Sequence, residues 1–398
     1  MQMFYSMRIA LVGDYPEDFN KIINGPQAVF AYLVNALRRL PDLELHVITA
    51  HKSPTDVRTF QRDGVAFYYL RYPRLPAEIT YPLMRRSIHQ VLHRIRPDLV
   101  HGQSTLRHGC IALGAGFPTV LVAHNVHGTE ARFAMSKIDR LRFRLQDELL
   151  SRYFVANIRH LVCINKYIRK SYEGVVNATF YDIPNPIDDA FFSLDPDHEK
   201  ANLVLFVGQL RIRKRPDLAL EALAIARLEV PDLTLHFAGA SVEEALKAKM
   251  DQYIADTNLG ENVRFLGHFS ETQLHEAYQQ ASIVMLTSDL ETSPMAIQQA
   301  MAAGKAVIAT AVGGVPYLID DGRTGLVIER NNPVQLARAL VTLAKTPGLK
   351  KQLGQEAHSY ALSHFRGEVV SRQTYAMYQK ILNTHRNCHE YSKQPVNQ

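Results

Sequence analysis

Short apolar runs alternate with longer amphipathic segments through the first half of the chain. In a typical intervening segment, residues 28–40, apolar positions recur at helical spacing. Apolar runs that are separated by helical segments indicate βαβ units, whose strands form a parallel sheet. The pattern predicts strands at residues 8–13, 44–49, 65–70, 98–102, 119–124 and 160–164.

The second half repeats this alternation, and a chain of 398 residues is too long for one ordinary core. We therefore expect an α/β protein with two Rossmann-like domains. Prolines and acidic residues collect at residues 181–202, which favours this segment as the join. The strands expected in the second half are residues 202–208, 233–239, 262–267, 282–287 and 306–310. The expected domains are residues 1–188 and 189–365, followed by a last segment at 366–398.

Composition is that of a globular protein. Hydrophobic residues make up 46% of the chain, yet no run of about 18 uninterrupted apolar residues predicts a transmembrane helix. The beginning of the chain has no apolar stretch followed by a small-residue cleavage site, so we expect a cytoplasmic protein. Cys110, Cys163 and Cys388 lie far apart without CxxC spacing, which predicts neither a disulfide framework nor a metal site.

Positive charge is concentrated in the first half. The net charge is +6, and residues 1–190 hold 24 Lys and Arg against 17 Asp and Glu, which leaves about −1 for the remainder. We therefore expect an acidic partner for the first half. Basic and aromatic residues do not interleave as in a nucleic-acid-binding module, so nucleic acid is not the expected partner.

Residues 136–154 mix arginines with leucine and phenylalanine at helical spacing. Such a segment suits an anionic membrane surface or a phosphorylated lipid carrier, which would bring the protein to the inner face of the membrane. A stripe of core-facing residues explains the same pattern. The arginines concerned are Arg140, Arg142, Arg144 and Arg152.

The most informative stretch begins with the apolar run at 282–287, which has the composition of a buried parallel strand. Residues 289–292 should form the loop at the carboxyl end of that strand. Ser293 is expected to be the N-cap of the next helix and Pro294 its first residue. The polar loop and the helix after it are therefore placed at the edge of the sheet where α/β proteins bind ligands.

Free backbone amides near Met295 and Ala296 suit a phosphate or a diphosphate, because the first turn of a helix carries partial positive charge. Glu291 lies beside these amides in the sequence. Gln299 falls on the same side of the helix by its period of about 3.6 residues. This stretch therefore predicts a nucleotide site with Glu291 next to the phosphates.

The stretch resembles the carboxyl-half signature of retaining glycosyltransferases of family 4, which have the GT-B architecture. The resemblance implies that Glu291 contacts the donor sugar and diphosphate. It places Gln299 at the ribose hydroxyls, where the family has a second Glu. An amide has one acceptor oxygen where a carboxylate has two, so we expect weakened or altered ribose recognition. The positions in register are Glu291, Pro294, Ala300, Met301, Ala302, Gly304, Gly313, Gly314 and Pro316.

Two glycine-containing loops also resemble family 4, whereas a GxGxxG fingerprint for NAD is absent after the first strand. Gly25, just ahead of a helix, resembles the start of the Gly-Gly loop that faces the donor diphosphate and the acceptor, with Pro26 at the position of the second glycine. An ordinary turn glycine explains Gly25 equally well. In the second half, Gly208 and Lys214 match the Gly-Arg-x-x-x-x-Lys diphosphate site, with Gln209 in place of the Arg. Nearby arginines could compensate for that Arg, namely Arg211, Arg213 and Arg215.

His124 ends an apolar run at the carboxyl edge of a predicted strand. Its segment resembles the family's Thr-Val-His-Gly segment, whose His reaches the donor sugar from the opposite domain. His127 is a second candidate, although the register through the following Glu130, Arg132 and Phe133 favours His124. The alternative for His124 is a hydrogen-bonded structural histidine.

The resemblance implies transfer of a sugar from a nucleotide diphosphate, such as a UDP- or GDP-sugar, to an acceptor hydroxyl with retention of anomeric configuration. It also implies that a helix at 367–382 returns to the first domain. Neither a metal nor a cofactor is expected, because helix N-termini and Lys214 can stabilise the leaving diphosphate. The expected catalytic residues are Glu291, His124 and Lys214. The expected donor-binding residues are Gly25, Gly208, Gln209, Lys214, Ser293, Pro294, Met295 and Gln299.

The expected acceptor is a saccharide or a lipid-linked saccharide, in envelope, glycolipid or exopolysaccharide synthesis. Two other functions fit the sequence. One is a GT-B nucleotide-sugar epimerase, which needs no acceptor. The other is a nucleotide-sugar-binding protein that has lost catalysis, for which the substitutions Pro26, Gln209 and Gln299 are the evidence.

Overall fold

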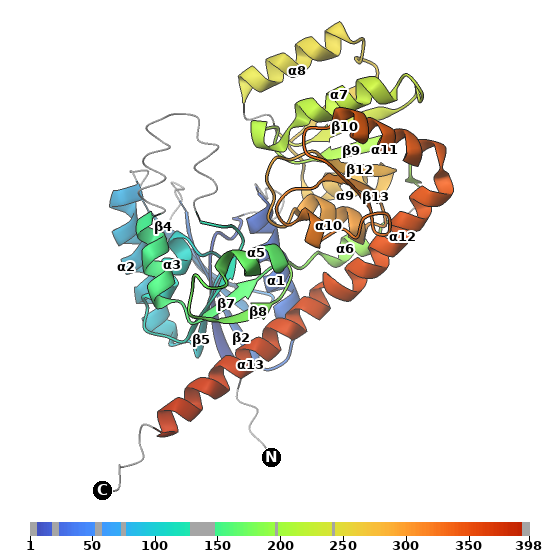
Figure 1. Cartoon of the computed structure of the whole chain (residues 1–398). Helices are drawn as coiled ribbons and strands as arrows, with labels where there is room; N and C mark the ends of the chain where they lie inside the picture. The colour runs from blue at the N-terminus through green and yellow to red at the C-terminus, as the bar shows by residue number, and fades with distance from the viewer. Residues whose placement is uncertain are drawn as a thin grey trace, which may run out of the picture. The chain divides into compact units, whose positions relative to one another are not determined.

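The chain divides into two compact units (Figure 1). Unit 1 consists of Met1–Pro16, Pro26–Pro184 and Gly367–Gln398, and unit 2 of Glu17–Gly25 and Asn185–Arg366. Each unit contains its own sheet and its own buried core. The structure is a computed structural model that describes residues 6–17, 24–51, 58–72, 77–127, 148–195, 198–240 and 243–391.

The sheet of unit 1 is built from β1 (Met7–Val12), β2 (Leu43–His51), β3 (Arg58–Arg62), β4 (Val65–Arg71), β5 (Leu99–Gly102), β6 (Thr119–Ala123), β7 (His160–Cys163) and β8 (Thr179–Asp182). Their order is β3-β4-β2-β1-β5-β6-β7-β8, and only the β3–β4 pair is antiparallel. Ile9 on β1 pairs with Leu45 on one side and Leu99 on the other. Most of the buried residues of these central strands are apolar, as expected for a parallel sheet that is covered on both faces.

The helices of unit 1 include α1 (Gly25–Leu37), α2 (Ala77–Ile95), α3 (Arg107–Leu113), α5 (Lys166–Tyr172) and α13 (Gly367–Tyr391). Residues 148–157 are also helical. The long α13, red in Figure 1, belongs to unit 1 although the chain reaches it from unit 2. It buries Val370, Thr374, Met377, Tyr378 and Ile381, a stripe at helical spacing. The helix expected at 367–382 is therefore present and continues to Tyr391.

The sheet of unit 2 has the order β11-β10-β9-β12-β13-β14, and all its pairs are parallel. Val284 at its centre pairs with Leu205 on β9 and with Val307 on β13. The carboxyl ends of these three strands therefore lie at one edge of the sheet. The strands are β9 (Leu203–Val207), β10 (Thr234–Ala238), β11 (Val263–Gly267), β12 (Ile283–Leu286), β13 (Ala306–Thr310) and β14 (Leu326–Ile328).

The core of unit 2 lies between this sheet and its helices, and it includes the fully buried Phe206, Phe237, Leu223 and Leu340. No helix in the described part of the chain is long and apolar enough to cross a membrane. The helices of unit 2 are α6 (Asp189–Phe192), η4 (Ile212–Lys214), α7 (Pro216–Ala226), α8 (Glu244–Asp256), α9 (Glu271–Gln280), α10 (Met295–Ala302), η5 (Val315–Tyr317), α11 (Pro333–Lys345) and α12 (Pro347–His364).

The expected α/β architecture with two Rossmann-like sheets is confirmed, and every apolar run named above forms a strand. The apolar pattern missed β3, β8 and β14 for a common reason. All five residues of β3 are exposed, β8 has no fully buried residue, and β14 is three residues long. Edge strands of this kind bury too little surface to leave an apolar run in the sequence.

Gly354 on α12 provides a test of the packing in unit 2. A Cβ at this position would lie 2.2 Å from the carbonyl oxygen of Gly304, just beyond the end of α10. We expect Gly354→Ala to lower the free energy of unfolding by about 2 kcal/mol, because backbone cannot move aside as a flexible side chain can. Gly348→Ala in the same helix is the control, since a Cβ there meets nothing within 4 Å. Urea unfolding should show no loss for the control, and equal losses in both variants would contradict the close approach.

Candidate active site

The loop after β12 occupies the carboxyl edge of the sheet of unit 2. β13 fixes its beginning, since the hydroxyl of Thr310 donates to the carbonyl oxygen of Ser288 at 2.7 Å. Gly313 and Gly314 fix the end of the loop, because the amide of Gly314 donates to the carbonyl oxygen of Glu291 at 2.9 Å. Gly313 has a φ of 51°, and a Cβ there would lie 2.0 Å from that same oxygen. The family-like glycine therefore permits the backbone approach that holds Glu291 in place.

The carboxylate of Glu291 is buried, with 6% of the residue exposed. Its Oε1 accepts hydrogen bonds from Nζ of Lys214 and, at 2.7 Å, from Oγ of Ser288. Nη1 of Arg213 lies 3.9 Å from the same oxygen. Two residues that the sequence places 77 positions apart are thus brought into an ion pair.

The pKa of Glu291 is the outcome of opposing effects. Burial alone would raise it, because a carboxylate loses hydration. The charges of Lys214 and Arg213 and the hydrogen bonds from Lys214 and Ser288 outweigh burial and hold the pKa below its ordinary value. Glu291 is therefore ionised at neutral pH and cannot serve there as a proton donor.

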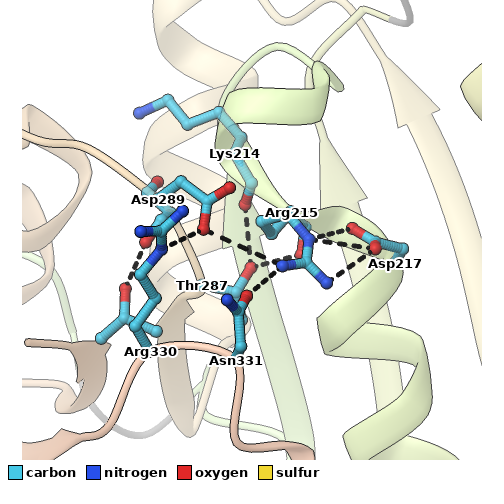
Figure 2. Close-up of polar contacts among 9 residues, drawn as sticks. Lys214, Arg215, Asp217, Thr287, Asp289, Arg330 and Asn331 are labelled. Atoms are coloured by element: carbon cyan, nitrogen blue, oxygen red, sulfur yellow. Dashed lines mark hydrogen bonds and ion pairs between the residues drawn. The ribbon is translucent and has the colours of Figure 1, made fainter. Parts of the chain in front are cut away.

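The neighbouring loop, which contains η4, is joined to the loop after β12 at several points (Figure 2). The amide of Asp289 donates to the carbonyl oxygen of Arg213 at 2.8 Å. The hydroxyl of Thr287 lies 2.9 Å from the carbonyl oxygen of Lys214 and 2.7 Å from that of Arg215. These bonds fix the backbone of Lys214, whose side chain points away from this network in Figure 2.

The guanidinium of Arg215 is paired with two carboxylates, those of Asp217 and Asp289. Its Nε lies 3.0 Å from both carboxylate oxygens of Asp217, and its Nη1 lies 3.8 Å from Asp289. Arg330 also donates to Asp289, at 2.7 Å. Arg213 instead donates to the carbonyl oxygen of Leu290 at 2.7 Å, on the Glu291 side. Of Arg213 and Arg215, only Arg213 is placed to add positive charge beside Lys214.

Gly208 directly follows β9 and has a φ of 146°. A Cβ at this position would lie 3.7 Å from Cε of Lys214, so the glycine and the lysine of the expected diphosphate site are close together. Gln209, which follows, is half-buried. Gly25 is the first residue of α1, so Gly25 and Pro26 lie inside the first turn and not ahead of the helix as expected. A proline in the first turn is tolerated because its missing amide hydrogen has no intrahelical acceptor there.

The start of α10 differs by one residue from the prediction. Pro294 is the N-cap, with an extended ψ of 113°, and Met295 is the first helical residue. The carbonyl oxygen of Pro294 accepts the amide of Ile297 at 3.1 Å. Ser293 is therefore not the N-cap, and its Oγ lies 3.4 Å from Oε1 of Gln298 instead of capping an amide. The first amides of α10 have no acceptor within the helix, as at any helix N-terminus.

Gln299 is buried, with 4% exposure, and its Oε1 lies 3.1 Å from the hydroxyl of Tyr278 on α9. The same hydroxyl lies 3.0 Å from the carbonyl oxygen of Ala296. Ala296 and Gln299 thus share one side of α10, as the helical period predicted. Sequence reasoning missed Tyr278 and also Ser288, because neither belongs to a local motif.

His124 lies in unit 1, directly after β6, and its Nε2 is 3.1 Å from Oε1 of Gln103. Burial lowers its pKa to about 4, so the imidazole is neutral at pH 7. His127 stacks on Phe154 with ring centroids 5.2 Å apart, which is the contact of a packed structural histidine. Glu130, Arg132 and Phe133 lie outside the described residues, as does most of the 136–154 segment.

Two family models match the chain, one for each half. The model for Glycosyltransferase Family 4 matches residues 23–191, and the model for Glycosyl transferases group 1 matches residues 189–360. The two matches meet close to the boundary between the units. The two halves of the chain therefore match two different glycosyltransferase models.

Curated relatives agree with these matches. An uncharacterized glycosyltransferase of Methanocaldococcus jannaschii is 23% identical over 335 residues, 83% of this chain and 88% of that protein. A D-inositol 3-phosphate glycosyltransferase of Streptomyces scabiei is 30% identical over 194 residues, 47% of this chain and 43% of that protein. The chain thus aligns with less than half of the length of the Streptomyces relative.

Solved structures share the fold. Sucrose-phosphate synthase from Thermosynechococcus elongatus has a TM-score of 0.79 at 20% identity, covering 95% of this chain and 100% of that one. HepE of Anabaena, in a complex with UDP-glucose, has a TM-score of 0.73 at 16% identity, covering 94% of this chain and 100% of that one. At such identities the likeness concerns the fold alone.

The neutral His124 predicts a pH dependence of stability. Its pKa is about 4 in the folded protein, against 6.5 for an ordinary histidine. Between these values the unfolded chain binds more protons, so the free energy of unfolding should fall as the pH is lowered from 6.5 towards 4. His124→Gln keeps a donor near Oε1 of Gln103 but cannot titrate. Urea unfolding near neutral pH and near pH 5 should therefore show a smaller loss in the variant, and an equal loss in both proteins would contradict this assignment.

Proposed function

Because the chain is a GT-B glycosyltransferase of the family 4 type, we propose that it transfers a sugar from a nucleotide diphosphate to an acceptor hydroxyl with retention of anomeric configuration. The observation that carries this proposal is the ion pair between the half-buried Lys214 and the buried Glu291, which lies four residues before the first residue of α10. A lysine amine, the charge of Arg213 and unbonded helix amides together suit a diphosphate.

A nucleotide sugar is the donor class that fits these charges. The solved HepE complex contains UDP-glucose, which supports a UDP-sugar as the first donor to test. The diphosphate gains negative charge as it leaves the sugar, and Lys214 and Arg213 would stabilise that charge from fixed positions. Glu291 keeps Lys214 oriented and accepts one of its three hydrogen bonds, so the amine retains two donors for phosphate oxygens.

Neither carboxylate of this loop is assigned as a nucleophile. Glu291 is engaged by Lys214 and Ser288, and Asp289 by Arg330 and Arg215. We therefore assign attack by the acceptor on the same face of the sugar. The bond from the anomeric carbon to the phosphate oxygen breaks, the bond to the acceptor oxygen forms, and the acceptor's proton passes to the leaving diphosphate.

We also propose a saccharide or a lipid-linked saccharide as the acceptor, in the synthesis of envelope, glycolipid or exopolysaccharide material. The support is the excess of Lys and Arg in residues 1–190, which suits an acceptor carrying phosphate or other negative charge. A peripheral contact with an anionic membrane belongs to the same proposal.

Glu291→Ala should reduce transfer at least about tenfold, equivalent to about 1.4 kcal/mol of transition-state stabilisation, because Lys214 loses the partner that orients it. His124→Ala should cause a loss of similar size. Steady-state transfer to an acceptor measures both, with Glu261→Ala as the control because this exposed glutamate lies away from the loop. Wild-type turnover in a folded Glu291→Ala protein would remove Glu291 from the site.

The same assay separates the two alternative functions. An epimerase would convert its nucleotide sugar without any acceptor, whereas a transferase forms a glycoside only when the acceptor is present. A protein that has lost catalysis would bind the nucleotide sugar and leave it unchanged with a competent acceptor. Either of these results would replace the transferase proposal.

Gln299→Glu should bind the donor nucleotide more tightly, by up to about tenfold, if this side chain meets the ribose. A carboxylate oxygen can accept from each ribose hydroxyl, while Tyr278 continues to donate as it does to Gln299. Calorimetric titration with UDP measures the change. Gln355→Glu adds the same charge to an exposed position of α12 and controls for electrostatics. Unchanged or weaker binding in Gln299→Glu alone would place the ribose elsewhere.

A further inference from the structure

The exposed side of α2 in unit 1 carries positive charge that no carboxylate of the helix balances. Between Thr80 and Pro97 the sequence contains four arginines and two histidines but no Asp or Glu. α2 lies beside α3 against the sheet of unit 1 (Figure 1). All four arginines are exposed, and they are Arg85, Arg86, Arg94 and, just after the helix, Arg96.

These arginines have no ion pairs, in contrast to others of unit 1. Within the described residues, no carboxylate lies within 4.0 Å of any of the four guanidinium groups. Like charges that lie close together on a helix are unfavourable, and an anionic partner would remove that cost. The arginines of unit 1 that do pair with carboxylates include Arg8, Arg38, Arg152 and Arg169.

The helical period places the arginines of α2 on one side. The opposite side packs into the core of unit 1, as helices of a parallel sheet do, and Ile88 and Leu92 on it are fully buried. From Arg85 to Arg94 the charges extend over roughly 14 Å of the helix axis. The exposed positions are Leu83, Arg85, Arg86, Gln90, His93 and Arg94, which together with Arg96 we call the α2 face.

Exposed apolar side chains accompany this charge. Leu83 on the α2 face is 46% exposed, and Leu149 in the helix at 148–157 is 70% exposed. Tyr153, one turn after Leu149, is 37% exposed. A Cβ on Gly114 would lie 2.8 Å from the hydroxyl of Tyr153 and 3.5 Å from Nη2 of Arg85, so the helix at 148–157 and α2 meet at this glycine.

We propose that the α2 face docks unit 1 on an anionic lipid membrane, with its arginines at the phosphates of the headgroups and Leu83 at the boundary with the acyl chains. Arginine next to exposed leucine suits this boundary, which offers both negative charge and an apolar layer. A nucleic acid offers phosphates but no apolar layer for the leucine. The inference deepens the membrane contact of the proposed function and rests on it, because a lipid-linked acceptor is met at a membrane surface.

The structure thus moves the membrane contact away from the arginines expected at 136–154. Of those four, Arg152 is the one within the described residues, and its Nε lies 2.8 Å from Oε1 of Glu148. That pair cancels its charge, whereas the arginines of the α2 face keep theirs. The leucine and tyrosine of the same helix remain available beside α2.

Co-sedimentation with lipid vesicles tests the docking without any sugar substrate. Wild-type protein should bind vesicles made of phosphatidylglycerol and phosphatidylcholine in equal parts, and it should not bind phosphatidylcholine alone. A variant with Arg85→Gln, Arg86→Gln and Arg94→Gln should bind the anionic vesicles at least about tenfold more weakly, since each arginine near such a surface contributes about fivefold. Binding should also fall with salt, because the screening length shrinks from about 10 Å at 0.1 M to about 3 Å at 1 M.

Two matched controls use exposed residues of unit 2. The variant with Arg264→Gln, Arg338→Gln and Lys351→Gln removes the same charge and should bind anionic vesicles as the wild type does. Leu83→Ser should weaken binding severalfold if the leucine enters the boundary with the acyl chains. Leu228→Ser, at a position that is 85% exposed, should not weaken it.

The proposal is overturned if wild-type protein ignores anionic vesicles, or if the arginine variants of unit 1 and unit 2 lose binding equally. It is also overturned if the wild type prefers a DNA duplex to the vesicles through the same three arginines, which would identify a nucleic acid as the partner. Failure of the proposed function is a separate result, because transfer to a water-soluble acceptor is measured without vesicles. There the variant of the α2 face should transfer sugar as the wild type does.

Discussion

The ion pair between Lys214 and Glu291 is the interaction on which the candidate site depends. A buried carboxylate is unfavourable unless it is paired and hydrogen-bonded, and Glu291 obtains both from Lys214 and Ser288. The pair joins the loops that follow β9 and β12, two neighbouring strands whose carboxyl ends share one edge of the sheet. The bonds of Thr287 and Asp289 to the backbone of the other loop keep that geometry before any ligand arrives.

The sequence predicted the frame of this site better than its contacts. The apolar runs placed β12 correctly. Because α/β proteins bind ligands in the loops at the carboxyl ends of parallel strands, the sequence also predicted that Glu291 lies at this edge of the sheet. Its pairing with Lys214 did not follow, because the two residues lie 77 positions apart and no local pattern links them. The predicted start of α10 was wrong by one residue. Proline suits both the N-cap and the first turn of a helix, so local propensity could not decide whether Ser293 or Pro294 is the N-cap.

In unit 1, too, local sequence patterns did not predict contacts between residues that lie far apart along the chain. The apolar run that ends at His124 predicted its place after a strand, but it did not predict the contact with Gln103, which directly follows β5. The hydroxyl of Tyr378 on α13 lies 2.5 Å from Nδ1 of His101 on β5, 277 positions away along the chain, so only the fold brings these two residues together. One signal was present in the sequence, since His101 interrupts an otherwise apolar strand. A polar side chain at such a position must find a buried partner.

The central claim is that Lys214 and Glu291 form a donor diphosphate site. Ligand-observed NMR of the wild-type protein and of Lys214→Ala against UDP-, GDP-, ADP- and dTDP-sugars, with hydrolysis followed in the same tube, tests it most directly. The account predicts that one nucleotide sugar binds the wild-type protein and slowly releases its diphosphate, and that Lys214→Ala loses most of both. Absence of binding to every nucleotide sugar, or equal binding and release by the two proteins, would contradict it.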